Sequence, residues 1–168
     1  SPSWQHSWLE WPFLDDGHRQ LAPALQAWCE QHLQTVDEND LNAACRSLVQ
    51  KLGQAGWLRY CVPAGEQGQY GGALPALDSR SLCILRETLA QYHALADFAF
   101  AMQGLGSGAI SLAGTEAQKQ AYLPAVAQGQ KIAAFALSEP NAGSDVAALS
   151  CSAVQQGESY VLNGHKTW

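Results

Sequence analysis

The stretch AFALSEPNAGSD, residues 134–145, marks the point at which the character of the sequence changes. It begins with the apolar run Ala134–Leu137, and Ser138, Glu139 and Pro140 follow directly. A hairpin turn uses Pro, Asn and Gly for its backbone geometry alone. This turn also gathers two hydroxyls and two carboxylates, so the sequence raises the question of whether something is held there.

Helical periodicity dominates the chain before this stretch, because apolar residues recur at intervals of three and four. The Gly- and Pro-rich residues 61–77 interrupt the pattern and are predicted to form a loop. Trp4, Trp8 and Trp11 have helical spacing and are predicted to form an N-terminal arm that packs on the body. Four helical segments are predicted over residues 14–32, 41–55, 82–96 and 95–112. The first contains Pro23, the second is capped by Asn39 or Asp40, and the third is preceded by Ser79. A fifth segment opens at the capping box Thr115–Gln118 and runs to about Ala127, with an end or kink at Pro124.

Strand signals begin near residue 132. Ile132–Leu137 is a continuous apolar run of strand length. Residues 150–155 and 160–162 are strand-like, Gly157-Glu158 can turn, and Asn163-Gly164 is the strongest short hairpin signal. We therefore predict a mainly α fold, with an N-terminal helical bundle domain over residues 1–131 and the first strands of a truncated antiparallel β-barrel domain over 132–168. So few strand residues cannot close a barrel, which predicts that the chain is a fragment of a longer protein.

Composition narrows the classes of function. The 168 residues are 47% hydrophobic with a formal charge of −6, which predicts a sizeable core and argues against nucleic acid as a partner. The five cysteines form no C-x-x-C pair, which predicts buried free thiols in a reducing compartment. The five histidines lack metal-ligand spacing, so no metal site is predicted. With no membrane span and no Lys or Arg before Arg19, the chain is predicted to be cytoplasmic.

A glycine-rich stretch, Gly104–Ala109, matches the letters G-x-G-x-x-A of a dinucleotide-binding motif. That motif must follow a strand and needs an acidic residue about 20 positions later. Here the stretch lies in a helical segment, and Val126-Ala127 stand where the acid should be. We therefore interpret the small residues as allowing close helix packing.

Several ordered segments together resemble one family. ALSEPNAGSDVAA (136–148) is similar to the signature of the acyl-CoA dehydrogenases. GTEAQKQAYLPAVAQG (114–129) and YVLNGHKTW (160–168) resemble the segments that flank this signature, and LGQAGW (52–57) and YGG (70–72) stand in the expected order. The resemblance covers nearly the whole chain, although only weakly over the first 50 residues. It implies a helical N-terminal domain, a middle β-barrel, a C-terminal four-helix bundle, and FAD between the barrel and that bundle.

The resemblance also implies roles for individual residues. Backbone groups of Phe135 and Leu137 and the hydroxyl of Ser138 would bond the pyrimidine edge of the flavin, and Trp168 would lie against one flavin face. Ser144 would contact the acyl-CoA substrate. Asp145 is interpreted as structural. The family's catalytic base is a glutamate of the C-terminal domain, so no residue of this chain is assigned as the base.

Two functional hypotheses follow. In the first, the full-length protein is an FAD-dependent acyl-CoA dehydrogenase of fatty-acid (lipid) metabolism that forms 2-enoyl-CoA, passes its electrons to an electron-transfer flavoprotein and is a homo-oligomer. A related acyl-CoA oxidase or flavin monooxygenase remains an open alternative, because these enzymes share parts of the signature. In the second, the chain is a non-catalytic helical module. Either way, the chain by itself is predicted to be inactive.

Overall fold

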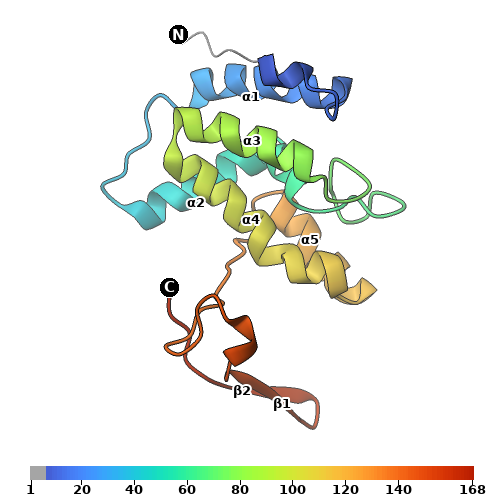
Figure 1. Cartoon of the computed structure of the whole chain (residues 1–168), viewed down its shortest axis with the longest axis vertical. Coiled ribbons are helices and arrows are strands. Elements are labelled where there is room, and N and C mark those ends of the chain that lie inside the picture. The colour runs from blue at the N-terminus through green and yellow to red at the C-terminus, as the bar shows by residue number, and fades with distance from the viewer. Residues whose placement is uncertain (1–6) are drawn as a thin grey trace. The chain divides into compact units, whose positions relative to one another are not determined.

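The computed structural model describes residues 7–168, in which helices come first and a β-hairpin follows (Figure 1). The chain divides into two compact units, one ending at Ala134 and the other comprising Phe135–Trp168. The predicted mainly α fold with a short antiparallel β segment is confirmed, whereas the domain boundary after residue 131 stays a prediction. The elements are the 3-10 helix η1 (Ser7–Glu10), α1 (Asp16–His32), α2 (Leu41–Gln54), the 3-10 helix η2 (Trp57–Cys61), α3 (Ser79–Tyr92), α4 (Ala94–Ala113), α5 (Glu116–Ala127), the 3-10 helix η3 (Val146–Ala148), β1 (Ser152–Gln156) and β2 (Ser159–Asn163).

Side-chain caps begin four of the five α-helices, and each cap satisfies a backbone N–H that the helix itself cannot pair. Asp40 accepts from the N–H of Ala43 at the start of α2. The predicted capping box of α5 is present, since Thr115 and Gln118 bond each other's backbone N–H groups. Asp15 and Asp78 cap α1 and α3. Ser79, which precedes the predicted apolar stripe, is the first residue of α3.

The N-terminal ends of α1 and α3 are joined by a buried histidine. His18 lies at the third position of α1, where its Nδ1 accepts from the N–H of Asp15 at 3.1 Å. Its Nε2 lies 2.6 Å from a carboxylate oxygen of Asp78. Burial alone would raise the pKa of Asp78, but the hydrogen bonds from Ser81, His18 and Arg80 outweigh it and hold this pKa well below its usual range. One imidazole therefore ties both helix starts together.

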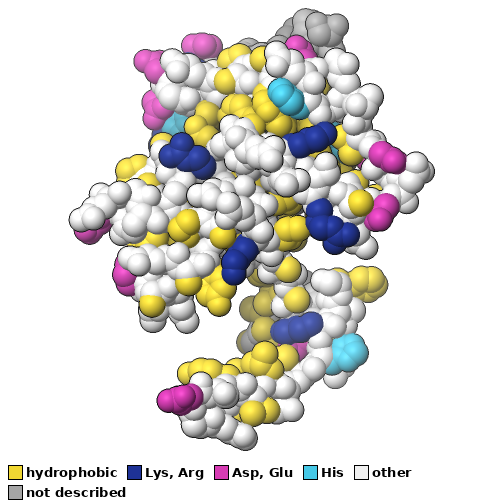
Figure 2. Space-filling view, turned by 180° about the vertical axis from the view of Figure 1, so that it is seen from behind, with side chains coloured by type: hydrophobic (Ala, Val, Ile, Leu, Met, Phe, Trp, Pro, Cys, Tyr) yellow, Lys and Arg dark blue, Asp and Glu magenta, His cyan; other side chains and the backbone are white. Residues whose placement is uncertain are grey.

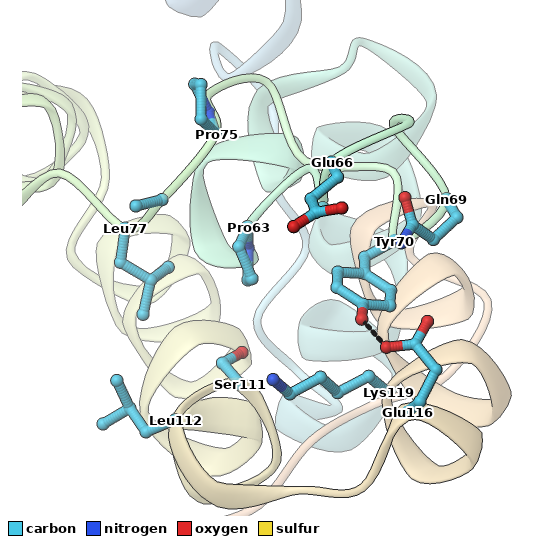
Figure 3. Close-up of a pocket in the computed structure, with 12 residues that line it drawn as sticks. Pro63, Glu66, Gln69, Tyr70, Pro75, Leu77, Ser111, Leu112, Glu116 and Lys119 are labelled. Carbon is cyan, nitrogen blue, oxygen red and sulfur yellow. Dashed lines mark hydrogen bonds between the residues drawn. The ribbon is translucent and has the colours of Figure 1, made fainter.

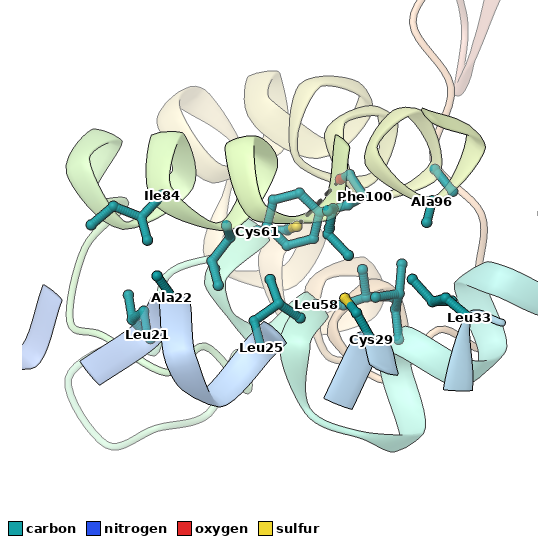
Figure 4. Close-up of a cluster of buried hydrophobic side chains, with 14 of the residues drawn as sticks. Leu21, Ala22, Leu25, Cys29, Leu33, Leu58, Cys61, Ile84, Ala96 and Phe100 are labelled. Carbon is teal, nitrogen blue, oxygen red and sulfur yellow. Dashed lines mark hydrogen bonds between the residues drawn. The ribbon is translucent and has the colours of Figure 1, made fainter. Parts of the chain in front are cut away.

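Helix α4 is the central element of the helical unit, because it packs against α2, α3, α5 and η2. α1 reaches the same core by lying along α3, which Figure 1 shows as neighbouring helices. Figure 4 shows side chains from these elements meeting in one cluster, with Leu25 of α1, Leu58 of η2 and Phe100 of α4 almost fully buried. A smaller cluster joins Tyr70 of the 61–77 loop to Leu123 of α5. The core therefore supports α4 from several sides.

Two details of the helical predictions are wrong. The stripe predicted over 82–96 is broken at His93, so that Ala96 belongs to α4 and not to α3. α5 runs to Ala127 as predicted, with Pro124 inside it, so that of the two expectations for Pro124 the end of the helix is not observed. Trp8 packs against the core as predicted for the arm, but the side chain of Trp11 is 53% exposed. The prediction for Trp4 lies outside the described residues.

The second unit contains a two-stranded antiparallel sheet in which Ser152 faces Asn163 and Gln156 faces Ser159. The turn is at Gly157-Glu158, with Gly157 at φ +63°, while Asn163-Gly164 ends β2 and forms no hairpin turn. Every residue of both strands is exposed. The strand predicted over Ile132–Leu137 is not formed in the described chain, because a strand needs a partner to pair with and this run has none.

The cysteines are free, as predicted, but only some of them are buried. Cys29 and Cys61 lie in the core, where burial raises the pKa of each thiol to about 12. Cys83 and Cys151 are exposed, contrary to the prediction of buried thiols. Within residues 7–168, no helix combines the length and the apolarity needed to cross a membrane.

Candidate functional site

Three of the four predicted cofactor residues lie at the start of the second unit, in a segment without helix or strand. The side chain of Phe135 is 44% exposed, and Leu137 and Ser138 are half-buried. Within the described chain, the N–H groups of Phe135 and Leu137 and the hydroxyl of Ser138 have no hydrogen-bond partner. The N–H groups of Ala136 and Ser138 also have no partner there, so five donors are free within these four consecutive residues.

The carbonyl groups of this segment, in contrast, are held by the last residues of the chain. The carbonyl oxygen of Leu137 accepts from the ammonium of Lys166 at 2.9 Å. The carbonyl oxygen of Ser138 accepts from the backbone N–H of Thr167, also at 2.9 Å. These two bonds fix the backbone next to the free donors.

Glu139 organises the second unit. Its carboxylate is almost completely buried and accepts from the N–H of Ser150 at 2.7 Å, the hydroxyl of Ser150 at 3.0 Å, the N–H of Cys151 at 3.0 Å and the ammonium of Lys166 at 2.9 Å. The hydrogen bonds from the N–H of Ser150 and from the ammonium of Lys166 are the main reasons why the pKa of Glu139 falls to about 2. The carboxylate is therefore ionised at neutral pH, and its hydrogen bonds hold together segments of this chain.

The turn after Glu139 presents its remaining polar groups to solvent. Two backbone hydrogen bonds between Glu139 and Ala142, of 2.9 and 3.1 Å, close the turn. Ser144 and Asp145 are exposed, and the carboxylate of Asp145 does not cap η3, although the residue directly precedes that helix. A Cβ at Gly143 would meet nothing within 4 Å. The predicted substrate residue Ser144 therefore lies on an open loop.

Trp168, the last predicted cofactor residue, is fully exposed and has a positive φ of 73°. Phe135, Leu137, Ser138, Ser144 and Trp168 all belong to the second unit of the chain. Their roles toward a cofactor or substrate stay predictions. The ion pair between Glu139 and Lys166 was not predicted from the sequence. Its only signal was that both residues lie in segments that resemble the family.

The helical unit has a separate cavity of about 710 Å³, between the 61–77 loop and the ends of α4 and α5 (Figure 3). The hydroxyl of Tyr70 donates to the carboxylate of Glu116, and the ammonium of Lys119 lies 5.9 Å from the centre of the Tyr70 ring. The hydroxyl of Ser111 is buried and unpaired at the edge of this cavity. None of the predicted site residues lines it.

Basic side chains do not gather on the face of the molecule that Figure 2 shows, where Lys and Arg are scattered singly between hydrophobic and uncharged residues. A nucleic-acid site would need a basic patch or stripe. The absence of nucleic acid as a partner stays a prediction from the acidic net charge of −6.

Comparisons with known proteins agree with the resemblance. Residues 15–130 match the model of the acyl-CoA dehydrogenase N-terminal domain. A probable acyl-CoA dehydrogenase of Bacillus subtilis is 35% identical over 159 residues, which are 91% of this chain and 26% of that protein. The mitochondrial isovaleryl-CoA dehydrogenase of Bos taurus is 32% identical over 160 residues, covering 92% of this chain and 36% of that protein.

A solved structure shows the same likeness in three dimensions. The crystal structure of an acyl-CoA dehydrogenase complexed with FAD, from Bacillus anthracis, superposes with a TM-score of 0.75 at 31% identity, covering 93% of this chain and 27% of that one. The chain thus spans well under half the length of these relatives. Because the family model matches most of its residues, the chain belongs to the acyl-CoA dehydrogenase family.

Proposed function

We propose that the protein of which this chain is a part is an FAD-dependent acyl-CoA dehydrogenase. It would remove a proton from the α-carbon and a hydride from the β-carbon of an acyl-CoA thioester and leave a 2-enoyl-CoA. The observation that carries the proposal is the set of free donors at Phe135, Leu137 and Ser138, within the segment that resembles the family signature.

These donors fit the chemistry of a flavin. The pyrimidine edge of FAD carries carbonyl oxygens and ring nitrogens that accept hydrogen bonds, and FAD supplies the hydride acceptor of the reaction. The N–H groups of Phe135 and Leu137 and the hydroxyl of Ser138 would bond this edge and stabilise negative charge on it. Trp168 would lay its exposed indole on a flavin face, and Ser144 would contact the acyl-CoA.

The proposal assigns no catalytic base to this chain. The resemblance places the catalytic base in the family's C-terminal domain, whereas residues 15–130 of this chain match the N-terminal domain. On the basis of the resemblance to the family, we also propose an electron-transfer flavoprotein as the electron acceptor. We propose on this basis a homo-oligomeric assembly of the full-length protein and a role in fatty-acid metabolism. The cytoplasmic location stays a prediction.

The test uses the full-length protein that contains this chain. We expect it to purify with FAD, and acyl-CoA thioesters of several chain lengths to reduce that flavin under anaerobic conditions, with 2-enoyl-CoA detected by mass spectrometry. Residues 1–168 alone should give no turnover above the flavin-only background with an artificial electron acceptor. A full-length protein that binds no FAD, or that converts no thioester, would contradict the proposal.

The alternatives give different results in the same experiment. An acyl-CoA oxidase would form hydrogen peroxide and consume oxygen with each turnover, without any added acceptor. A flavin monooxygenase would insert oxygen into its product instead of forming a 2-enoyl-CoA. A non-catalytic helical module would contain no flavin.

A further inference from the structure

Helix α4 holds the segment that leads directly into the proposed flavin-contacting residues. The side chain of Gln103 is completely buried, and its amide makes three hydrogen bonds to main-chain groups. Its Nε2 donates to the carbonyl of Val126 at 3.1 Å and to the carbonyl of Lys131 at 3.0 Å. Its Oε1 accepts from the N–H of Ala133 at 2.8 Å. Both donors and the acceptor of the amide are therefore used to fix the main chain after α5.

One turn further along α4, the same segment touches the helix backbone. A Cβ placed on Gly106 would lie 2.6 Å from the nitrogen and 2.8 Å from the oxygen of Ala134. Contacts under about 3 Å are not tolerated by real Cβ atoms, so only glycine allows residues 133–134 to lie this close to α4. This contact gives a physical reason for one glycine of the G-x-G-x-x-A stretch, Gly106.

We propose that Gln103 and Gly106 form an anchor that fixes residues 131–134 and thereby positions Phe135, Leu137 and Ser138 for the flavin. The inference rests on the proposed function. Gln103 and Gly106 are positioning residues, because neither carries one of the free donors itself. They act through the chain: Ala133 and Ala134 are held on α4, and Phe135 follows with no intervening residue.

Geometry makes the anchor sensitive to small changes. If the amide were replaced by an apolar side chain of similar size, the carbonyl of Lys131 and the N–H of Ala133 would lose their partner, whereas the carbonyl of Val126 would keep the N–H of Gly129. Leaving a partly buried polar group unpaired is unfavourable. A methyl group on Gly106 would push residues 133–134 off the helix. Either change should move the donors of 135–138 without touching them.

The experiment compares Gly106→Ala and Gln103→Met with a matched control in the full-length protein. Gly108→Ala is the control, since it adds the same methyl group to the same helix, where a Cβ would meet nothing within 4 Å. Two readouts are measured well below the melting temperature of each variant. The first is amide hydrogen exchange of residues 131–138 relative to α2 and α3, and the second is the dissociation constant of FAD.

We expect both test variants to speed exchange in 131–138, to leave α2 and α3 unchanged, and to weaken FAD binding about tenfold, which is the factor that ~1.4 kcal/mol produces. The control should match the wild type in both readouts. Because exchange does not depend on catalysis, it reports the anchor directly. Gln103→Met keeps the test decisive if Gly106→Ala does not fold.

Two results would overturn the inference in distinguishable ways. If the wild-type protein binds FAD and the test variants bind it equally well, the anchor does not position the donors, while the proposed function stands. If the wild-type protein binds no FAD, the proposed function fails, and the positioning role fails with it.

Discussion

Ser138 and Glu139 are neighbours in the sequence, but their side chains have different partners. The carboxylate of Glu139 is saturated by Ser150, Cys151 and Lys166, whereas the hydroxyl of Ser138 is free in the part of the chain that the structure describes. The polar turn at residues 138–145 therefore has two kinds of group. Groups such as the Glu139 carboxylate stabilise the second unit, and groups such as the Ser138 hydroxyl are available to a ligand.

We expect Ser138→Ala to weaken FAD retention in the full-length protein by about 1 kcal/mol, or somewhat more if the lost hydrogen bond is to a charged partner. Flavin content after gel filtration and the rate of flavin reduction by substrate would both show the loss. Ser152→Ala is a suitable control, because it removes an exposed hydroxyl from β1 in the same unit. If flavin content and reduction rate stay at wild-type values, Ser138 has no role at the cofactor.

The lowered pKa of Glu139 predicts that the stability of the second unit depends on pH. The pKa of this carboxylate is about 2 in the folded chain, against an ordinary value of 4.5. The unfolded chain therefore binds more protons between these values, and stability rises with pH there. The contribution of Glu139 is fully present above about pH 4.5 and is lost as the pH falls toward 2.

Glu139→Gln should remove this dependence and loosen the unit at neutral pH. The local probes are the amides of Ser150 and Cys151, whose exchange we expect to be faster in the variant at pH 6 and to converge with the wild type in acid. Glu158→Gln, at the exposed hairpin turn, should leave both amides unchanged. Equal protection in wild type and Glu139→Gln at pH 6 would show that the carboxylate does not hold this part of the chain.

At the scale of elements, local signals were sufficient to predict where helices start. The Asp40 cap and the Thr115–Gln118 capping box depend only on residues within one turn, so the sequence alone reveals them. The break between α3 and α4 at His93 has no such signal, since the apolar stripe continues across it. The run Ile132–Leu137 fails for a related reason: strand formation depends on a partner that a local pattern cannot supply.

In the candidate site, too, local sequence patterns could be recognised and contacts between distant residues could not. The resemblance placed Ser138 and Ser144 in the sequence without knowledge of their surroundings. The partners of Glu139 could not be predicted, because Lys166 lies 27 positions away and only the folded chain brings the two together. The role of Gln103 was hidden for the same reason, since its bonds reach Val126, Lys131 and Ala133.

The contact between α2 and the end of α5 leads to a prediction for Gly53. A Cβ at this position would lie 2.3 Å from the carbonyl oxygen of Gln128 and 2.7 Å from the nitrogen of Gly129. Alanine in a helix is normally better than glycine by up to about 1 kcal/mol. Here the overpacking should outweigh this gain, and we expect Gly53→Ala to lower the free energy of unfolding by about 1–3 kcal/mol.

Urea unfolding followed by helical circular dichroism would measure the effect of Gly53→Ala. Gly108→Ala provides the comparison, because the space around it is open and the helix preference should make it neutral or slightly stabilising. A midpoint for Gly53→Ala at or above that of the wild type would mean that α2 and the end of α5 separate easily, contrary to the close approach seen in the structure.

At the scale of the whole molecule, the two units differ in how much apolar surface they bury. α2 and α3 contribute Leu48, Leu52, Leu85 and Leu89 to the core, each almost fully buried. Burying one such side chain is worth ~1.5–3 kcal/mol. The strands β1 and β2, in contrast, have no buried residue, and a two-stranded hairpin is at best marginally stable in water.

This difference predicts uneven stability in the 168-residue chain. Amide exchange should be slow in α2 and α3, and it should be fast from about Cys151 to Trp168, because local opening costs little where few apolar contacts are lost. The amides of Cys151, bonded to Glu139, and of Thr167, bonded to Ser138, should be the slowest of that segment. Exchange measured by mass spectrometry or NMR on a dilute monomer tests this. If residues 151–168 exchange as slowly as the helices, the hairpin is stable by itself, and the prediction that the β domain is incomplete is wrong.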